Sequence, residues 1–274
     1  MNVMLAADDT LIDGLELVLW TLLTHNKNVN IYVATMNITI YEKAIDAFHK
    51  YNTISKQHRD WLTRIVKYLD YNSEICFLDC EEYYHNYLEG GVNEDTPFTP
   101  FASLRLLVDK LIPDIDDVLY LDCDTAVQAN LEPMYRQCIY NNKMDYAASF
   151  AYDAFDGKGE MVSGVLIFNL ARMRDDRFLD RARENYKNNK YKYPDQMAIR
   201  DAGECIRLPE SYGYMEPLES CYYTPAILHF TNNLSPKIYS RDIPNIKEYF
   251  YKRYPQFKFV QDGLKMLSKL ILYT

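Results

Sequence analysis

The sequence predicts an α/β fold with a Rossmann-like, mostly parallel sheet flanked by helices. Short apolar segments rich in branched and aromatic residues read as buried strands, and three occur early, at Asn2–Ala7, Asn30–Met36 and Ile75–Leu78. Segments with apolar residues at helical spacing separate them, and this alternation is typical of a parallel, wound sheet. With 274 residues, 48% of them hydrophobic, the chain is long enough for one large α/β domain.

The helices of the first half follow from periodicity and from helix-ending residues. Leu11–Leu23 has apolar residues at helical spacing, and Ser55 is a suitable N-cap for a helix over Ser55–Leu69. A helix is also predicted over Ile40–Tyr51. The loop Gly90–Pro97 precedes a further helix, Phe101–Ile112, which Pro113 ends.

The second half continues the alternation. Ser163–Leu170 is a strongly apolar strand, and its Gly164 suggests a close approach of the backbone to another group. Pro194 suits the first turn of a helix, where Asp195 complements the dipole. The other predicted elements are strands at Asp145–Tyr152 and Ala226–Phe230, a short helix from Leu131, a charged helix over Arg172–Lys187 and a loop over Asn232–Tyr239.

The central motif is an Asp-x-Asp pair after the predicted strand Val118–Leu121. Asp122 and Asp124 stand two residues apart, so in extended backbone both side chains leave on the same side. Two carboxylates at the end of a buried strand are costly unless a positive group lies between them, and Mg²⁺ or Mn²⁺ suits such an oxygen pair. The alternative is that Asp122 ends the strand and Asp124 caps the next turn.

Three other positions have a functional and a structural interpretation each. Asp8 follows the first strand and has two interpretations. It accepts hydrogen bonds from a ribose or a base, or else Asp8 or Asp9 simply caps the following helix. Arg105, inside an apolar helix, either meets a phosphate or carboxylate or extends to water. His229, at the end of an apolar strand, is either structural or completes a metal site with two aspartates.

Composition narrows the classes of partner and the compartment. The net charge of -9 argues against general binding to nucleic acid. No export signal and no membrane-spanning apolar run are found, and the six cysteines form no Cys-x-x-Cys pair, so reduced thiols in a cytoplasmic protein are expected.

Residues 241–274 form a basic and aromatic helical segment that follows the main domain, residues 1–240. Its apolar helical face, with lysines nearby, either lies peripherally on an anionic membrane or packs on the core or on another subunit. That face consists of Leu264, Met266, Leu267, Leu270 and Ile271.

The order of these features resembles glycosyltransferase family 8, whose members are retaining enzymes with the GT-A fold. The resemblance covers roughly Met1 to Tyr239, and its most specific part is the stretch Leu119–Thr125 after the helix with Arg105. Four further stretches resemble family motifs: Ala6-Ala7-Asp8-Asp9, Ser163-Gly164-Val165, Asp195-Gln196 and Leu228-His229-Phe230.

The resemblance implies a role for each matching residue. Asp122, Asp124 and His229 are expected to hold Mn²⁺, or Mg²⁺, beside the diphosphate of a UDP-sugar. The donor nucleotide is expected at Ala6, Ala7, Asp8, Thr10 and Cys123, with Lys237 at the diphosphate. The sugar and the catalytic centre are expected at Arg105, Asp153, Gly164, Asp195 and Gln196.

The implied activity is transfer of glucose or galactose from a UDP-sugar to a saccharide or glycolipid acceptor, with retention at the anomeric carbon. Several positions depart from the family pattern on the donor side: Thr10-Leu11, Val162, Met197 and Asn232-Asn233. We interpret them as an altered sugar preference. They also favour the alternative, a non-catalytic or weakly active protein that binds a nucleotide sugar.

Overall fold

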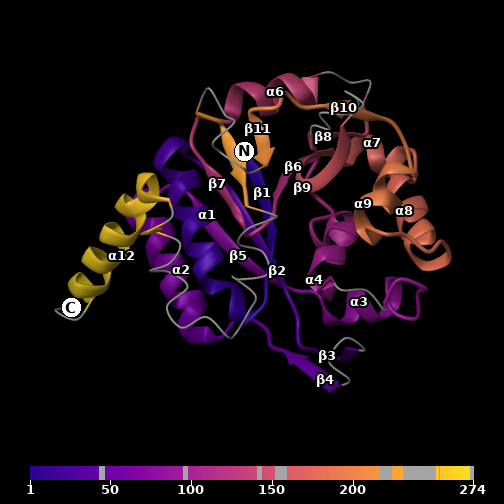
Figure 1. The fold of residues 1–274 in the computed structure, drawn as a ribbon, viewed down its shortest axis with the longest axis horizontal. Helices are drawn as coiled ribbons and strands as arrows, with labels where there is room; N and C mark the ends of the chain where they lie inside the picture. The colour runs from indigo at the N-terminus through magenta and orange to yellow at the C-terminus, as the bar shows by residue number, and fades with distance from the viewer. Residues whose placement is uncertain are drawn as a thin grey trace.

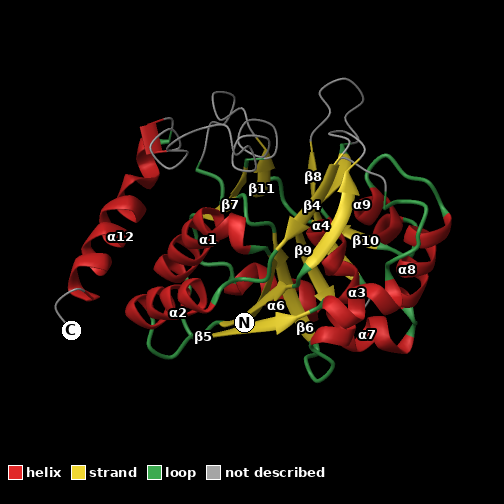
Figure 2. Cartoon of the chain, turned by 90° about the horizontal axis from the view of Figure 1, so that it is seen from below, coloured by secondary structure: helices red, strands yellow, loops and turns green. Residues whose placement is uncertain are grey.

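The computed structural model describes residues 1–42, 47–94, 98–140, 144–151, 159–215, 224–230, 251–252 and 254–271. Its centre is a seven-stranded sheet in the order β10-β8-β9-β6-β1-β2-β5 (Figures 1 and 2). The strands are β1 Asn2–Ala6, β2 Asn30–Thr35, β5 Glu74–Asp79, β6 Asp117–Leu121, β8 Tyr146–Ala151, β9 Glu160–Asn169 and β10 Cys205–Arg207.

The sheet is mostly parallel, which confirms the predicted fold class. β1 runs parallel to β2 and β6, β2 to β5, and β8 to β10. β9 is antiparallel to both of its neighbours, β6 and β8. Reversal at β9 places its Ser163-Gly164 segment beside the carboxyl end of β6, because Leu121 pairs with Val165.

Helices cover both faces of the sheet, so the central strands are apolar on both sides. Val3 and Leu5 of β1 belong to one buried cluster, whereas Met4 and Ala6 belong to the other, as the two-residue period of a strand requires. In Figure 1, α1 and α2 lie on one side of the sheet, and α4, α8 and α9 lie on the other. The helical segments are η1 Asp9–Leu11, α1 Ile12–His25, α2 Lys56–Leu69, α3 Glu81–Tyr87, α4 Pro100–Ser103, η2 Leu104–Leu107, α5 Val108–Leu111, α6 Glu132–Tyr140, α7 Leu170–Asp175, α8 Phe178–Asn188, α9 Pro194–Arg200, η4 Pro255–Phe257 and α12 Lys258–Ile271.

A second sheet of three short strands adjoins the end of β6. β12 (Ile227–His229) lies between β7 (Thr125–Val127) and β11 (Tyr212–Met215). β12 is antiparallel to β7 with His229 opposite Thr125. This register carries His229 from a distant part of the chain to the residue that follows the Asp-x-Asp motif.

The prediction of a helix over Ile40–Tyr51 is wrong. β3 (Ile38–Glu42) and β4 (Ala47–Tyr51) form an antiparallel hairpin that pairs with no other strand among the described residues. β3 is rich in branched and aromatic residues, which favour strands, and cross-strand pairing decides the state. One such pair joins the rings of Tyr41 and Phe48, with centroids 5.2 Å apart.

The predicted helix over Phe101–Ile112 is divided into α4, η2 and α5. Two side chains donate to backbone carbonyl groups that would accept main-chain hydrogen bonds in a regular helix. Ser103 Oγ donates to Pro100 O at 2.7 Å, and Arg105 Nε donates to Ala102 O at 2.7 Å. The predicted helix over Arg172–Lys187 is also divided, into α7 and α8, and the left-handed Arg177 (φ 53°) separates them.

The C-terminal helix α12 packs on the core, one of the two arrangements that the sequence allowed. Val260, Leu264 and Leu267 are buried. Gly263 lies against Trp20 of α1 so closely that a Cβ there would be 2.0 Å from Trp20 Cζ2. Within the described ranges, no helix is long and apolar enough to cross a bilayer.

Candidate active site

The carboxyl end of β6 supplies the two aspartates, and backbone hydrogen bonds fix the segment that carries them. Asp122 N donates to Gly164 O of β9 at 2.9 Å, and Phe230 N donates to Asp124 O at 2.9 Å. Thr125 Oγ1 donates to Asp122 O at 2.8 Å. The motif is therefore held between β9 and the end of β12, and it presents both carboxylates on one side.

His229 reaches the same point. Its Nε2 lies 3.1 Å from Asp124 Oδ1 and 3.7 Å from Asp122 Oδ2, and one donor atom from each residue lies within 4.8 Å of the others. Gly164 makes room for the ring, since a Cβ at that position would be 2.1 Å from His229 Cε1. The close approach that the sequence indicated at Gly164 is thus an approach to this imidazole.

The chemistry of these donor atoms fits a divalent cation. Asp124 Oδ1 and both ring nitrogens of His229 are buried and make no hydrogen bond with the described residues. Buried polar atoms are normally paired, and a cation between the carboxylates and the ring would satisfy Asp124 Oδ1 and the His229 nitrogen that faces them, Nε2. Two carboxylates and one imidazole suit Mn²⁺, Mg²⁺ and similar ions, so the described part of the chain contains a candidate metal centre.

The pKa shifts at this centre indicate a shortage of positive charge. Burial raises the pKa of Asp122; Arg105 opposes this, while Asp124 adds to it. Burial lowers the pKa of His229, but the neighbouring Asp124 and Asp122 outweigh burial and raise it. A bound cation would favour the ionised carboxylates and the neutral imidazole.

Arg105 has acidic partners, so the alternative in which it extends to water is wrong. Only 3% of it is exposed. Nη2 donates to Asp122 Oδ1 at 2.8 Å, Nε lies 3.0 Å from Asp195 Oδ2, and Nη1 donates to Ser163 O. Burial disfavours the guanidinium charge, but Asp122, Tyr120 and Asp195 outweigh it and raise the pKa of Arg105. Its carbon Cζ lies 4.4 Å from the centre of the Tyr120 ring.

The first turn of α9 is tied to the same segment of β9. Ser163 Oγ donates to Asp195 Oδ2 at 3.1 Å, and Ser163 N donates to Gln196 Oε1 at 3.2 Å. The carbonyl oxygen of Gln196 is thereby occupied, which leaves its amide group as a hydrogen-bond donor. Asp195 is buried and joins Arg105 to Ser163.

The turn after β1 has the capping geometry that the sequence allowed. Asp8 Oδ1 accepts hydrogen bonds from Thr10 N at 3.2 Å and from Thr10 Oγ1 at 2.7 Å. The other carboxylate oxygen, Oδ2, is buried and makes no hydrogen bond with the described residues. Burial raises the pKa of Asp8. Cys123 Sγ donates to Ala6 O at 3.3 Å, and Ala7 N donates to Ala34 O at 3.0 Å.

A cavity of about 390 Å³ joins most of these groups. It is lined by the metal-centre residues and by Ala6, Arg105, Cys123, Gly164, Asp195 and Gln196. Ala7, Asp8 and Thr10 lie near it along the chain but do not line it. Two predicted site residues, Asp153 and Lys237, lie outside the described residues.

Sequence reasoning missed some residues that shape this site. Gly14 allows α1 to approach the motif, since a Cβ there would be 2.5 Å from Cys123 O. A lone glycine inside a helical pattern was the available signal. Tyr193 also lines the cavity, and no local pattern distinguishes it; Tyr120 and Ser163 line it too, and they lie in recognised motifs but were given no role of their own.

Comparisons with known proteins place this chain in a family. The family model for glycosyl transferase family 8 matches residues 2–236. No curated protein matches. Among solved structures, an active-site mutant of LgtC is 19% identical with a TM-score of 0.63, and the alignment covers 96% of each chain.

Two other structures are similar to this chain. The galactosyltransferase LgtC in complex with donor and acceptor sugar analogs is 18% identical, with 94% of this chain and 95% of that chain covered and a TM-score of 0.60. The glycosyltransferase GlyE of Streptococcus pneumoniae is 17% identical, with 97% and 63% covered and a TM-score of 0.58. Given the family match over most of its length, the chain belongs to glycosyl transferase family 8 and has the GT-A fold.

Proposed function

We propose that this glycosyltransferase is a metal-dependent, retaining hexosyltransferase that moves glucose or galactose from a UDP-sugar to a saccharide or glycolipid acceptor. The observation that carries the proposal is the convergence of Asp122, Asp124 and His229, from β6 and β12, on one point beside the cavity. Family membership supports sugar transfer. The LgtC complex with donor and acceptor sugar analogs supports a donor and a saccharide acceptor.

Asp122, Asp124 and His229 would hold Mn²⁺ or Mg²⁺. When bound, such an ion supplies Lewis-acid stabilisation of the negative charge that builds on a departing diphosphate. The protein contributes a fixed set of donor atoms, of which Asp124 Oδ1 and His229 Nε2 make no hydrogen bond with the described residues, while Asp122 Oδ1 accepts one from Arg105. Because two carboxylates and one imidazole do not complete an octahedral shell, room remains for phosphate oxygens.

Arg105, Asp195 and Gln196 would orient the sugar. Arg105 is buried and held by two carboxylates, so its charge and direction are set before substrate arrives. Asp195 Oδ2 is already engaged by Arg105 and Ser163, which suits a positioning role. Gln196 is near the anomeric carbon in this proposal, and an amide is a poor nucleophile. Attack from the face that the diphosphate leaves therefore explains retention better than a covalent intermediate does.

Asp153 and Lys237 keep the roles that the family resemblance implies, Asp153 at the sugar pocket and Lys237 at the diphosphate. Ala6, Ala7, Asp8, Thr10 and Cys123 keep the nucleotide role, and among them Asp8 retains one buried oxygen without a hydrogen bond from the described residues.

The test of this function is a comparison of UDP-glucose and UDP-galactose turnover with and without Mn²⁺. Asp124→Asn should lower turnover by at least about 100-fold, the scale for losing one preorganised electrostatic group. Asp114→Asn is the matched control, since Asp114 is exposed and lies away from the cavity. Turnover that survives EDTA, or an active Asp124→Asn variant, would refute the metal role. Product NMR should show the donor's anomeric configuration retained.

We also propose a cytoplasmic location with peripheral contact to an anionic membrane through α12. Phe259, Met266 and Leu270 are 43%, 48% and 52% exposed and recur at helical spacing along its outer side. Lys258, Lys265 and Lys269 recur at the same spacing beside them. An exposed apolar stripe next to a row of lysines is suited to anionic headgroups.

Co-sedimentation with phosphatidylglycerol vesicles tests this contact. The triple variant with Lys258, Lys265 and Lys269 changed to glutamine should bind less, and wild-type binding should weaken with salt. Equal binding by both proteins, or none by either, would remove the membrane contact and leave sugar transfer untouched.

A further inference from the structure

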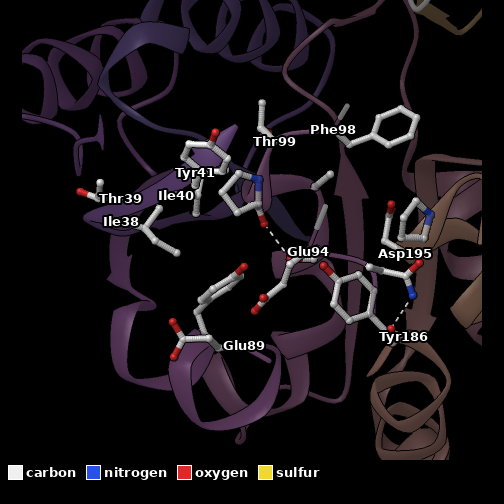
Figure 3. A pocket seen from close by; sticks show the side chains of 16 residues that line it. Ile38, Thr39, Ile40, Tyr41, Glu89, Glu94, Phe98, Thr99, Tyr186 and Asp195 are labelled. Carbon is white, nitrogen blue, oxygen red and sulfur yellow. Dashed lines mark hydrogen bonds between the residues drawn. The ribbon is translucent and has the colours of Figure 1, made fainter. Parts of the chain in front are cut away.

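A second cavity, of about 310 Å³, adjoins the one that contains the metal centre (Figure 3). Phe98, Thr99, Ala102 and Asp195 line both cavities, so the two cavities share a wall that these residues form. The second cavity extends from Asp195 toward the β3–β4 hairpin, and Figure 3 shows Ile38, Ile40 and Tyr41 of β3 on the side opposite Tyr186 and Asp195. Of its lining residues, only Asp195 was among the site residues that the sequence predicted.

The lining has a chemistry that differs from that of a phosphate site. Three carboxylates line it; Asp195 is paired with Arg105, which leaves Glu89 and Glu94 as its acidic groups, and no lysine, arginine or histidine lines the cavity among the described residues. A phosphate, uronate or sialate would meet like charges there. Carboxylates accept hydrogen bonds well, so a neutral group rich in hydroxyl donors fits instead.

Tyr84 of α3 adds a hydroxyl group to this lining. It is 3% exposed and lines the cavity. Burial, followed by the neighbouring Tyr186, Glu94 and Glu89, raises the pKa of Tyr84. The phenol therefore stays protonated and offers both a donor and an acceptor to an occupant.

The hairpin adds aromatic surface to this cavity. Tyr41 is 46% exposed and lines it, and its ring packs edge-on against Phe48, which is 76% exposed. Exposed aromatic rings in a group are unusual on a soluble surface and mark sites of contact. Aromatic faces suit the apolar C–H faces of a sugar ring while the surrounding carboxylates and hydroxyls take its O–H groups.

We propose that this second cavity binds an uncharged sugar unit of the acceptor. The inference rests on the proposed function, because the diphosphate end of the donor belongs at the metal centre on the other side of Asp195. A sugar unit held against this shared wall would present the rest of the acceptor to the donor cavity. The acceptor class is thus a neutral saccharide, with anionic sugars excluded from this position by Glu89 and Glu94.

Direct binding tests the cavity without any turnover. Saturation-transfer NMR with methyl glucoside, methyl galactoside and lactose should detect binding to the full chain in the absence of donor, and glucuronic acid should bind more weakly than these neutral sugars. Tyr84→Phe removes one hydroxyl and should weaken binding by about 5- to 10-fold, as expected for a lost hydrogen bond. Tyr83→Phe is its matched control, since Tyr83 is the neighbouring residue and does not line the cavity.

A second pair of variants covers the case in which Tyr84→Phe misfolds. Glu94→Gln removes a charge on an exposed residue and should weaken neutral-sugar binding while reducing the discrimination against glucuronic acid. Glu82→Gln, on the exposed side of α3, is its control. No binding by the wild-type protein, tighter binding of glucuronic acid, or equal losses in test and control variants would overturn the proposal.

Kinetics then separates this proposal from the proposed function. Tyr84→Phe should raise KM for a saccharide acceptor more than KM for the UDP-sugar; a rise confined to the donor would overturn the acceptor assignment. If the wild-type protein shows no UDP-sugar turnover while neutral sugars bind with the predicted variant pattern, the proposed function fails and the sugar site stands.

Discussion

Gly164→Ala tests the packing that holds His229 beside the two aspartates. The added Cβ would lie 2.1 Å from His229 Cε1 and 2.6 Å from Nε2, whereas carbon atoms in good contact are about 3.5–4.0 Å apart. His229 is 1% exposed and lines the cavity, so the cavity is the space into which a displaced ring would turn. Either the imidazole leaves its place or the backbone of β9 shifts.

The expected cost follows from this overlap. Overpacking a close-packed interior costs about 1–3 kcal/mol. A protein of this size loses about 2–4 °C of melting temperature per kcal/mol, so the melting temperature should fall by roughly 2–12 °C. Displacement of His229 should also weaken Mn²⁺ binding by at least about 10- to 100-fold, the loss seen when only the support of a ligand is disturbed.

The assay is a double-mutant cycle in EDTA, followed by Mn²⁺ titration. Gly164→Ala should destabilise the wild-type background but have little effect in His229→Ala, because truncation of the ring frees the space that the new methyl group needs. Thermal melts and urea unfolding measure the stability of the four proteins in the cycle. Electron paramagnetic resonance of Mn²⁺ measures how tightly the ion binds. An additive cycle, or unchanged melting and Mn²⁺ affinity in Gly164→Ala alone, would contradict the contact on which the metal centre depends.

Three further substitutions test other parts of the fold. Arg105→Met should cost about 3–5 kcal/mol in urea unfolding, because it leaves the buried Asp195 and the partly buried Asp122 without their partner. Gly263→Ala should release α12 from Trp20 and increase cleavage of the C-terminal segment in limited proteolysis. Although burial raises the pKa of Asp9, hydrogen bonds from Ser55 and His58 outweigh it and lower that pKa. The resulting stability is present above the unfolded pKa of about 3.9 and is lost as the pH falls through the lower folded value. Asp9→Asn should therefore reduce the urea midpoint at pH 7 and change it little at about pH 2.

Local patterns were sufficient wherever a strand is buried on both faces. β1 and β6 are short apolar runs that are followed by carboxylates. The pattern alone places Asp122 and Asp124 at the carboxyl end of a buried strand. The predicted N-cap Ser55 is confirmed, since its Oγ accepts a hydrogen bond from His58 N. In these cases the information lies within a few consecutive residues, because burial and capping are decided there.

Other features depend on contacts between distant segments, and the sequence left them open. Ile40–Tyr51 has apolar residues that suit a helix, but pairing across the β3–β4 hairpin decides its state. The two interpretations of Arg105 differ only in whether Asp122 and Asp195 lie within reach, which requires η2, the end of β6 and α9 to meet. The second cavity is formed by β3, α3, α8 and α9 together, so no single stretch of sequence indicates it.

The carboxylate of Asp8 has one oxygen that caps the following helix and one that is left for a ligand. Oδ1 accepts both hydrogen bonds from Thr10, while Oδ2 is buried with no hydrogen bond from the described residues. Asp8 does not line the cavity, so in the proposed function a bound uracil would displace the atoms that cover Oδ2 before its N3–H group donates to it. A hydrogen bond to a charged group contributes about 1.5–3 kcal/mol.

Asp8→Asn therefore preserves the cap through its amide oxygen but presents an N–H group where uracil needs an acceptor. In calorimetry with Mn²⁺ present, the Kd for UDP should rise by about 10- to 100-fold. The Kd for CDP should change less, because N3 of cytosine is an acceptor that an asparagine N–H can meet. Equal losses for both nucleotides would mean that the substitution disturbs the turn itself, and an unchanged Kd for UDP would restrict Asp8 to capping.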